Sequence, residues 1–441
     1  MNNRTGVAVP LVVLAVLTLV TTAYVAGRPS GSDQGSRAPE RAGPGDVRSL
    51  ESEVLSQSIG ALEEKHSGDP DNYVLGYALA DRTMQRFELE ADLADLRRAE
   101  TVTRTAMRLA PGRAAASARL SLILLAHHEF EQALRAAREG VAVDSTDQSA
   151  NAALFDAALA VGQPALMDGA LRRLRPGSLT RQLREARWLE VTGQSDEAFR
   201  TMSRACDRLD ASPARRAVVA WCFARLGTIE RERSGPDVAA RWLQRALSVE
   251  AGYRNAIEGL ADLAYGRQEW ETAERLYARI ATDAHPDLYL RLAEVAGARG
   301  DAERRQRHEA GFMRATAGPD GERMYARELA LYLVSHDELE LRDRALALAQ
   351  SDVARRSTAE GMTVLAWVHL MRAELVEART ASELSLKLSG RAPSPTDRYV
   401  RGRVLEALGR DDDAGPLLAA ATSDPGLLHF FAQRDLRRRQ R

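Results

Sequence analysis

The stretch AARWLQRALSVE at residues 239–250 decides the fold, because its small and apolar residues recur at the spacing of one helix face. Ala239, Leu243 and Ala246 stand four and then three positions apart, so all three lie on the same side of a helix. The same pattern begins at two pairs of positions with one common spacing, Ala99 with Ala133 and Ala239 with Ala273. This spacing is a period of about 34 residues, which is typical of a solenoid of repeated helix-turn-helix units.

Composition supports an all-helical reading of the 441 residues. Hydrophobic residues make up 45% and charged residues 28%, as in ordinary core-forming proteins, whereas aromatic residues make up only 5%. Cores with so few aromatic side chains are built by close approach of helices around small residues. The 61 basic and 62 acidic residues give a formal net charge of -1. Such a balanced chain has no long-range field that attracts a polyanion, so we expect no nucleic acid partner.

An apolar run, VAVPLVVLAVLTLVTTAYVA at residues 7–26, follows the short basic start of the chain. At about 1.5 Å rise per residue, an uncharged helix of this length just crosses a bilayer. We expect residues 1–26 to be a signal anchor, with a cleaved signal peptide as the alternative because Thr21 and Ala23 suit a peptidase. In either case the rest of the chain is expected on the extracytoplasmic side, membrane-anchored or secreted. Residues 27–48 are rich in Gly, Pro, Ser and charge and predict a disordered linker.

Small residues recur in two columns across residues 49–426, the predicted helical repeat array. The first column belongs to second helices and contains Ala133, Ala198, Ala239, Ala273, Ala378 and Ala414. The second column lies a fixed distance earlier in the chain and contains Ser121, Ala186, Gly227, Ala261, Ala366 and Gly402. Two helices approach closely only where neither carries a bulky side chain at the contact. The columns therefore predict where the two helices of each unit cross.

These columns resemble those of tetratricopeptide-repeat proteins, of the bacterial type with an N-terminal membrane segment, over roughly residues 70–426. The resemblance implies a right-handed α-α superhelix of about nine or ten helix pairs, preceded here by the hydrophobic N-terminal helix and the flexible linker. In the first unit Gly76 and Ala99 stand nearly twice as far apart as the corresponding residues of other units, so we expect longer helices there. The units at 148–176 and 287–316 are degenerate, and we expect helix pairs with altered curvature.

In such an array the first helices line a concave groove, which is the expected site for a protein or peptide partner. We therefore expect a membrane-tethered or exported interaction scaffold. The partner-binding candidates flank the small crossing residue on the exposed face of the first helices: Thr228, Arg231, Glu258, Asp262, Tyr265, Thr363, Trp367, Leu370, Tyr399, Arg403 and Glu406. The Lys and Asn residues with which family members capture a C-terminal carboxylate are missing from this face, so that mode of recognition is not expected.

No motif predicts an enzyme, a cofactor or a metal site. His127, His128 and Glu129 stand where the turn of one unit is expected, and adjacent histidines cannot share a helix face. The acidic run at residues 411–413 directly precedes a second helix, where carboxylates stabilise the helix N-terminus. The alternative function is a small-ligand-binding or catalytic protein with a pocket at the degenerate repeats. That alternative predicts a concave cluster of titratable residues with shifted pKa values.

The two cysteines, Cys206 and Cys222, lie near the end of one second helix and early in the next first helix. In an oxidising exterior they could pair if their Cα atoms came within about 7 Å. We expect buried free thiols instead, because repeat cores often use Cys as a small apolar residue.

Residues 427–441 predict a basic C-terminal capping helix. Its apolar side carries Leu427, Leu428, Phe430, Phe431 and Leu436, which would cover the apolar end of the last repeat. The alternative is that its arginines contact anionic lipid headgroups, as in amphipathic helices that lie on membranes.

Overall fold

The computed structural model describes residues 50–212, 214–282, 285–389, 393–423, 426 and 428–440. The signal anchor predicted at residues 1–26 and the linker predicted at 27–48 lie outside these residues. Within the described part of the chain, none of the helices combines the length and the apolar composition needed to cross a bilayer.

The described residues form helices and no strand, which confirms the all-α prediction. Helix α1 spans Leu50–Gly68 and precedes the first pair. Ten helix pairs follow, in agreement with the predicted nine or ten: α2 (Tyr73–Glu90) with α3 (Leu93–Leu109), α4 (Ala114–Ala126) with α5 (Phe130–Val143), α6 (Gln148–Ala160) with α7 (Pro164–Arg173), α8 (Leu179–Val191) with α9 (Ser195–Asp210), α10 (Arg216–Arg233) with α11 (Pro236–Val249), α12 (Arg254–Gly266) with α13 (Trp270–Ile280), α14 (Asp287–Ala298) with α15 (Ala302–Ala315), α17 (Ala326–Leu333) with α18 (Leu339–Arg355), α19 (Ala359–Met371) with α20 (Leu375–Leu388), and α21 (Pro395–Ala407) with α22 (Asp411–Thr422). The short α16 (Pro319–Met324) precedes the eighth pair, and α23 (Phe430–Gln440) follows the tenth.

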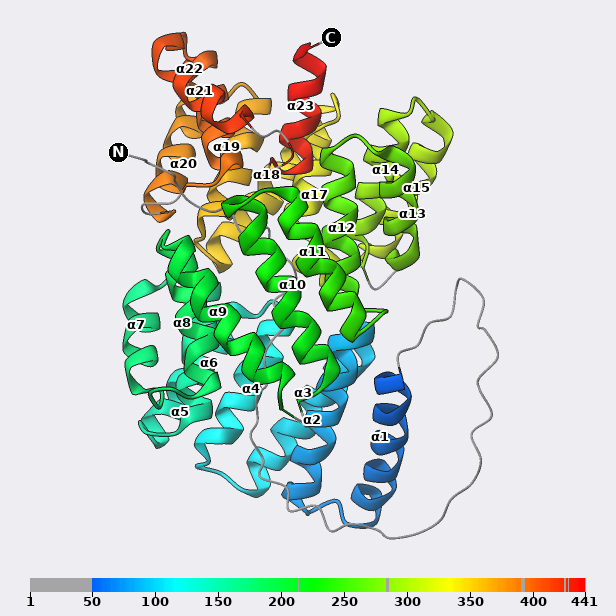
Figure 1. The fold of residues 1–441 in the computed structure, drawn as a ribbon, viewed down its shortest axis with the longest axis vertical. Helices are drawn as coiled ribbons and strands as arrows, with labels where there is room; N and C mark the ends of the chain where they lie inside the picture. The colour runs from blue at the N-terminus through cyan, green and yellow to red at the C-terminus, as the bar shows by residue number, and fades with distance from the viewer. Residues whose placement is uncertain are drawn as a thin grey trace.

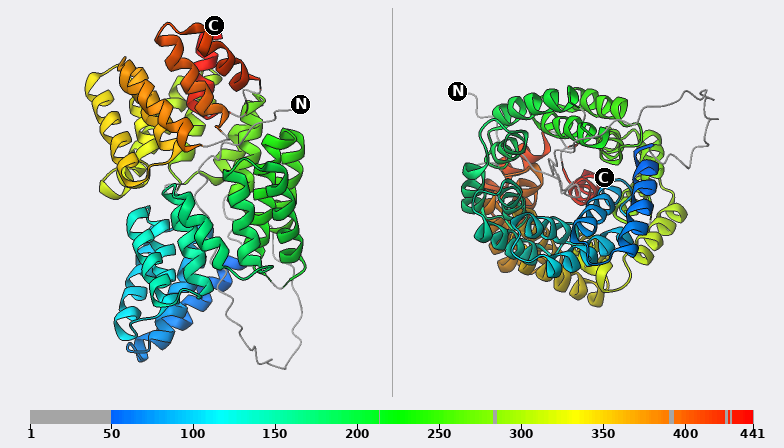
Figure 2. Two further views of the ribbon diagram at one scale, coloured as in Figure 1. Left: turned by 90° about the vertical axis from the view of Figure 1, so that its left-hand side faces the viewer. Right: turned by 90° about the horizontal axis from the view of Figure 1, so that it is seen from below.

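The pairs wind around a common axis, as Figures 1 and 2 show, and form a ring when the molecule is viewed along that axis. First helices of consecutive pairs contact one another, as α4 does with α6, α10 with α12 and α19 with α21. In a superhelix the inner path is the shorter one, so the helices that touch from pair to pair lie on the concave side. We call this surface, lined by the first helices, the inner face.

The small-residue columns mark the helix crossings as predicted. The six alanines of the second helices are between 0% and 2% exposed. A Cβ atom added to Gly227 would lie 2.9 Å from Leu243 Cγ, and one added to Gly402 would lie 2.7 Å from Leu418 Cγ. These positions leave no room for a side chain, which is the physical reason for the repeating pattern.

A recurrent local signal ends most first helices. In nine of the ten pairs the turn contains one residue with positive φ, such as Gly162, Gly300 or, without a glycine, His128 at φ 59°, and the exception is the turn between α17 and α18. His128 thus lies in the turn between α4 and α5, as the sequence predicts for residues 127–129. At the helix starts, Asp147 caps α6 by accepting a hydrogen bond from the Ala150 N–H at 2.8 Å.

The irregular units still form helix pairs. In the first pair α2 has 18 residues and α3 has 17, so the additional residues lengthen both helices as expected. The degenerate units at 148–176 and 287–316 form the pairs α6–α7 and α14–α15, although α7 is only 10 residues long. The weak sequence columns at these two units therefore do not mean that the repeat is lost.

Successive turns of the superhelix touch one another. Arg215, just before α10, forms ion pairs with Glu51 of α1 at 2.5 Å and with Glu88 of α2 at 3.1 Å. Farther along, Arg323 of α16 forms an ion pair with Glu129, in the turn before α5. These contacts join helix pairs that are far apart in the sequence.

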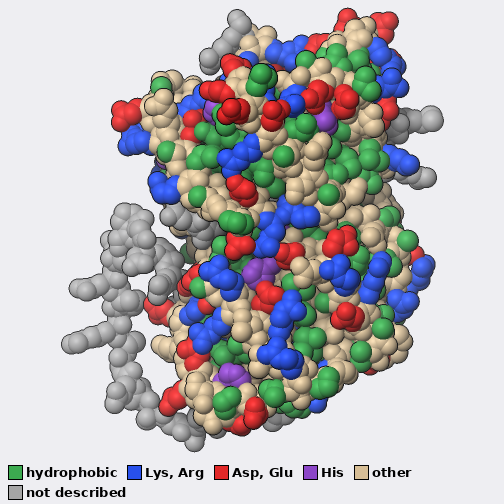
Figure 3. Space-filling view, turned by 180° about the vertical axis from the view of Figure 1, so that it is seen from behind, with side chains coloured by type: hydrophobic (Ala, Val, Ile, Leu, Met, Phe, Trp, Pro, Cys, Tyr) green, Lys and Arg blue, Asp and Glu red, His purple; other side chains and the backbone are tan. Residues whose placement is uncertain are grey.

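The outer surface carries charges of both signs. On the face shown in Figure 3, arginines and carboxylates are interspersed with apolar and uncharged side chains. This mixture agrees with the formal net charge of -1.

Candidate functional site on the inner face

The C-terminal helix α23 lies inside the ring of helix pairs, against their inner face (Figure 2). Phe431 is buried, and its ring centroid lies 5.0 Å from that of Trp367 on α19. Phe430 is buried as well, and the Arg291 guanidinium of α14 lies 4.7 Å from the centroid of its ring. Two adjacent aromatic side chains therefore anchor the start of α23 between two first helices.

Charged side chains hold the remainder of α23. Arg434 donates a hydrogen bond to Glu294 of α14 at 2.7 Å, and Arg437 donates one to the Tyr265 hydroxyl of α12 at 2.6 Å. Hydrogen bonds that involve a charged group are among the stronger ones in proteins. Burial raises the pKa of Tyr265 to about 12, so this hydroxyl stays neutral.

Helix α21 contacts the same segment from the other side. Asp435 accepts hydrogen bonds from the Tyr399 hydroxyl and from Arg403 Nε, both at 2.8 Å. Glu406 accepts one from Arg439 at 2.5 Å. Burial acts to raise the pKa of Glu406, but the hydrogen bonds from Arg403 and Arg439 outweigh it and leave this pKa below its usual value.

Seven residues of the inner face thus receive the helix, and we call them the α23 site. They are Tyr265, Arg291, Glu294, Trp367, Tyr399, Arg403 and Glu406, from four first helices. The segment before α23 adds one more contact, because Arg231 of α10 donates a hydrogen bond to the Gly426 carbonyl. The chain therefore binds one of its own helices where a partner was expected.

Most of the partner-binding candidates meet at this place. Arg231, Tyr265, Trp367, Tyr399, Arg403 and Glu406 all contact the C-terminal segment. The others have contacts within the array: Thr228 donates to the Ala224 carbonyl, Thr363 donates to Asp397, Leu370 is buried in the core, Glu258 pairs with Arg254, and Asp262 accepts from Tyr277. Arg291 and Glu294, both on α14, are receiving residues that the sequence columns did not indicate.

The sequence predicts that the helix at residues 427–441 caps the last repeat. Its contacts include α21 of the last pair and extend beyond it to first helices of three earlier pairs, as far as α12. The sequence pattern shows that the helix is amphipathic. An amphipathic helix suits the end of the array and the inner face equally, so the pattern does not distinguish these two locations.

A cluster of acidic residues adjoins the start of α23. Burial raises the pKa of Glu258 on α12 and of Glu328 on α17 to about 7, and it also raises the pKa of Asp287 on α14. Arg254 forms an ion pair with Glu258 at 3.1 Å. Three helices contribute to this cluster, and only Asp287 belongs to one of the degenerate units where the alternative function predicts titratable residues with shifted pKa values. The sequence did not reveal it, because the three carboxylates are separated by up to two repeats.

Arginine–carboxylate pairs also join neighbouring first helices in the first half of the array. Arg119 of α4 pairs with Asp81 of α2, and Arg184 of α8 pairs with Asp156 of α6, both at 2.5 Å. These charged side chains have partners within the array. In this part of the inner face they therefore stabilise the contacts between neighbouring helix pairs.

Metal ligation has no support in the part of the chain that the structure describes. No group of three or more His, Cys, Asp or Glu side chains there is placed to hold an ion. His127 Nε2 lies 3.0 Å from Glu100, and burial with nearby Arg356 lowers the pKa of His128 to about 3.

Comparisons with known proteins give distant structural neighbours. No protein-family model matches the sequence, and no curated protein matches it. Among solved structures, human IFIT1 with m7Gppp-AAAA is 13% identical, covers 86% of this chain and 91% of its own, and has a TM-score of 0.45. Yeast Tom70 is 11% identical over 82% of this chain and 88% of its own, with a TM-score of 0.36. Pseudomonas aeruginosa PilF is 19% identical over 49% of this chain and 97% of its own, with a TM-score of 0.35.

The repeat period, the ten helix pairs and the small residues at both crossing positions together determine the type of fold. The chain is a tetratricopeptide-like solenoid. Its inner face, with α23 docked on it, is the candidate functional site.

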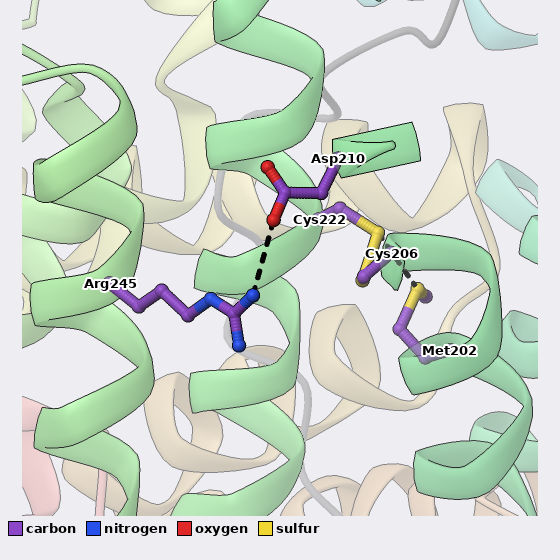
Figure 4. Close-up of a disulfide and its surroundings, with 5 residues drawn as sticks. All are labelled: Met202, Cys206, Asp210, Cys222 and Arg245. Atoms are coloured by element: carbon purple, nitrogen blue, oxygen red, sulfur yellow. Dashed lines mark hydrogen bonds and ion pairs between the residues drawn. A yellow bond between two sulfur atoms is a disulfide. The ribbon is translucent and has the colours of Figure 1, made fainter. Parts of the chain in front are cut away.

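One prediction about the solenoid is wrong. Cys206 of α9 and Cys222 of α10 are not free thiols but form a disulfide, with Cα atoms 5.5 Å apart (Figure 4). The short connection between the two helices brings their ends together, and both sulfur atoms are buried beside Met202. Near the disulfide, Arg245 of α11 forms an ion pair with Asp210 of α9 at 3.2 Å, so α11 contacts α9 in the same region. The sequence spacing was compatible with pairing, but only the helix packing decides it.

Proposed function

We propose that this protein is a membrane-tethered interaction scaffold that binds a helical segment of a partner protein on its inner face. The observation that carries the proposal is the docking of α23, because it gives the inner face a surface that accepts an amphipathic helix. Helix-in-groove recognition uses anchors at positions i, i+4 and i+7. Phe430, Arg434 and Arg437 have this spacing, and each contacts a first helix.

The tether is proposed from the sequence. Residues 7–26 are apolar and uncharged, and the extracytoplasmic location follows from such a segment in front of a long domain. The Cys206–Cys222 disulfide supports this location, because structural disulfides persist mainly in oxidising compartments. Alkaline extraction of membranes tests the tether, and protease treatment of intact cells tests the side on which the array lies.

A second candidate function is the binding of a small cationic ligand. It is favoured by the acidic cluster of Glu258, Asp287 and Glu328, whose carboxyl pKa values are raised by burial. Buried carboxylates with raised pKa values are more frequent at functional sites than elsewhere, although ion-pair networks also produce them.

Crosslinking in the native host, followed by mass spectrometry of the membrane fraction, tests the scaffold. The variant Glu294→Arg/Glu406→Arg reverses two charges of the inner face, and both side chains are partly exposed, so the fold should persist. Its matched control is Glu303→Arg on α15, whose side chain is 84% exposed. A partner that is lost from the double variant and retained by the control supports the proposal. A partner retained by both contradicts it.

A further inference from the structure

We propose that α23 is a ligand that the chain carries for its own inner face, and that the partner is an arginine-rich amphipathic helix with two adjacent aromatic residues that displaces it. This inference rests on the proposed scaffold function and specifies its partner class. It assigns α23 a regulatory role, because the site opens only when α23 leaves.

The location of α23 shows whether this helix acts as a bound ligand or as a cap for the end of the array. A capping helix covers the exposed end of the last pair, here α21 and α22. The contacts of α23 include α21 but extend beyond it to Tyr265 on α12 and Glu294 on α14, four and three pairs before the end of the array. A helix that reaches this far along the inner face occupies the surface on which solenoids bind their partners.

The helix is also too short to be stable alone. It has 11 residues, and isolated helices shorter than about 12–15 residues are marginal in water. Its helical state therefore depends on docking, and release of α23 and its unfolding occur together.

The contacts of α23 are few and chemically defined. They are the aromatic contact of Phe431 with Trp367, the contact of Phe430 with the Arg291 guanidinium, the hydrogen bonds that Asp435 accepts from α21, and hydrogen bonds from Arg434, Arg437 and Arg439 to inner-face oxygen atoms. A partner that competes needs the same aromatic anchor and the same positive charges. Arginine is favoured over lysine, because its planar guanidinium donates in a fixed geometry and also stacks on aromatic rings. Arg437 does both with Tyr265, over whose ring centroid it lies at 5.2 Å.

The acidic cluster extends the site beyond α23. Glu258 and Asp287 surround Arg291, which lies over Phe430 at the start of the helix. Burial raises the pKa of both carboxyl groups, although Arg254 and Arg291 oppose the rise. Directly before the aromatic pair α23 has His429, whose pKa burial holds well below its usual value, so a partner helix with arginine at that position would bring a further positive charge toward these carboxylates. Because α23 is tethered to the array, it is present at a high effective concentration. A partner that displaces it must bind the inner face more tightly, and this additional contact would supply the extra affinity.

A labelled peptide of residues 428–441, LHFFAQRDLRRRQR, tests the inference on the full chain by fluorescence anisotropy. The variant Arg434→Ala/Arg437→Ala weakens the docked helix without touching the receiving residues. Arg438→Ala is the matched control, because Arg438 lies on the same helix and is exposed. Since each hydrogen bond to a charged group is worth roughly a factor of ten or more, we expect the peptide to bind the double variant at least about tenfold more tightly than the wild type. The control should bind like the wild type.

Two further outcomes complete the test. Adding Glu294→Arg/Glu406→Arg to the double variant should abolish peptide binding, and far-UV circular dichroism should show that each variant keeps its helical content. Equal affinity for the wild type and the double variant, or no binding to the double variant, would overturn the role of α23. That result leaves the scaffold proposal intact, since the scaffold proposal fails only if partner crosslinking is insensitive to the inner-face charges.

Discussion

Leu243 of α11 packs between two glycines, Gly227 of α10 and Gly259 of α12. A Cβ atom added to either glycine would lie 2.9 Å from the Leu243 side chain. Gly227→Ala should lower stability by about 1–2 kcal/mol, because overpacking costs about 1–3 kcal/mol and alanine returns up to about 1 kcal/mol of helix propensity. Thermal denaturation followed by circular dichroism measures the change. The control is Gly415→Ala on α22, where no atom lies within 4 Å and the melting temperature should not fall.

Glu258 is expected to make stability depend on pH. Burial raises its pKa from 4.5 to about 7, with Asp287 also raising it and Arg254 opposing, so the folded protein binds a proton that the unfolded chain has lost. Stability from this group is therefore greatest at low pH and falls as the pH rises from about 4.5 through 7. Glu258→Gln should remove this fall. Between pH 5 and pH 8 the variant should therefore lose less stability than the wild type, by on the order of 2–3 kcal/mol.

Melting temperatures at pH 5 and pH 8 check this prediction. Glu303→Gln is the control, because its side chain is 84% exposed on α15 and the variant should follow the wild-type pH dependence. If Glu258→Gln and the wild type lose stability in parallel, burial of Glu258 does not govern the effect.

At the scale of elements, the disulfide fastens α9 to α10. Its two cysteines have a sequence separation of 16, and constraint of the unfolded chain by a loop of this size is worth about 3 kcal/mol. Reduction should therefore lower the melting temperature of the wild type. The variant Cys206→Ala/Cys222→Ala should melt at the lower temperature with or without reductant. A wild-type melting temperature that does not change on reduction would contradict a structural role for the disulfide.

Elements also mark the limit of what the sequence predicts. Gly227 and Ala239 stand in consecutive helices, close together in the sequence, so the pattern that places them in one crossing can be read locally. Arg434 and Glu294 are separated by 140 positions and belong to no repeated column, so only the winding of the superhelix brings them together. The helix pairs were thus predictable, as were six candidate residues that prove to contact the C-terminal segment. The docking of α23, the acidic cluster and the disulfide were not, because each depends on how neighbouring or distant pairs pack.

At the scale of the whole molecule, contacts between successive turns hold the superhelix closed, and they include ion pairs as well as the Arg356 guanidinium over the Phe130 ring. Arg215 joins α10 to α1 and α2, and Arg323 joins α16 to the turn before α5. An open solenoid has contacts only between adjacent pairs, and its shape then varies with small rotations at every interface. The contacts between turns oppose those rotations, and they fix the inner face that receives α23.

The variant Arg215→Ala/Arg323→Ala should therefore extend the molecule while its helices remain intact. Each substitution leaves carboxylates that no longer bind an arginine across the gap between turns, so the turns separate. Small-angle X-ray scattering should show a larger radius of gyration and a larger maximum dimension, with an unchanged circular dichroism spectrum. Wild-type protein in 1 M salt should change in the same direction, because the screening length falls to about 3 Å. The matched control is Arg200→Ala/Arg307→Ala, whose arginines are 63% and 66% exposed and pair only within their own helices. Identical scattering from both double variants would mean that packing within the pairs alone sets the pitch of the superhelix.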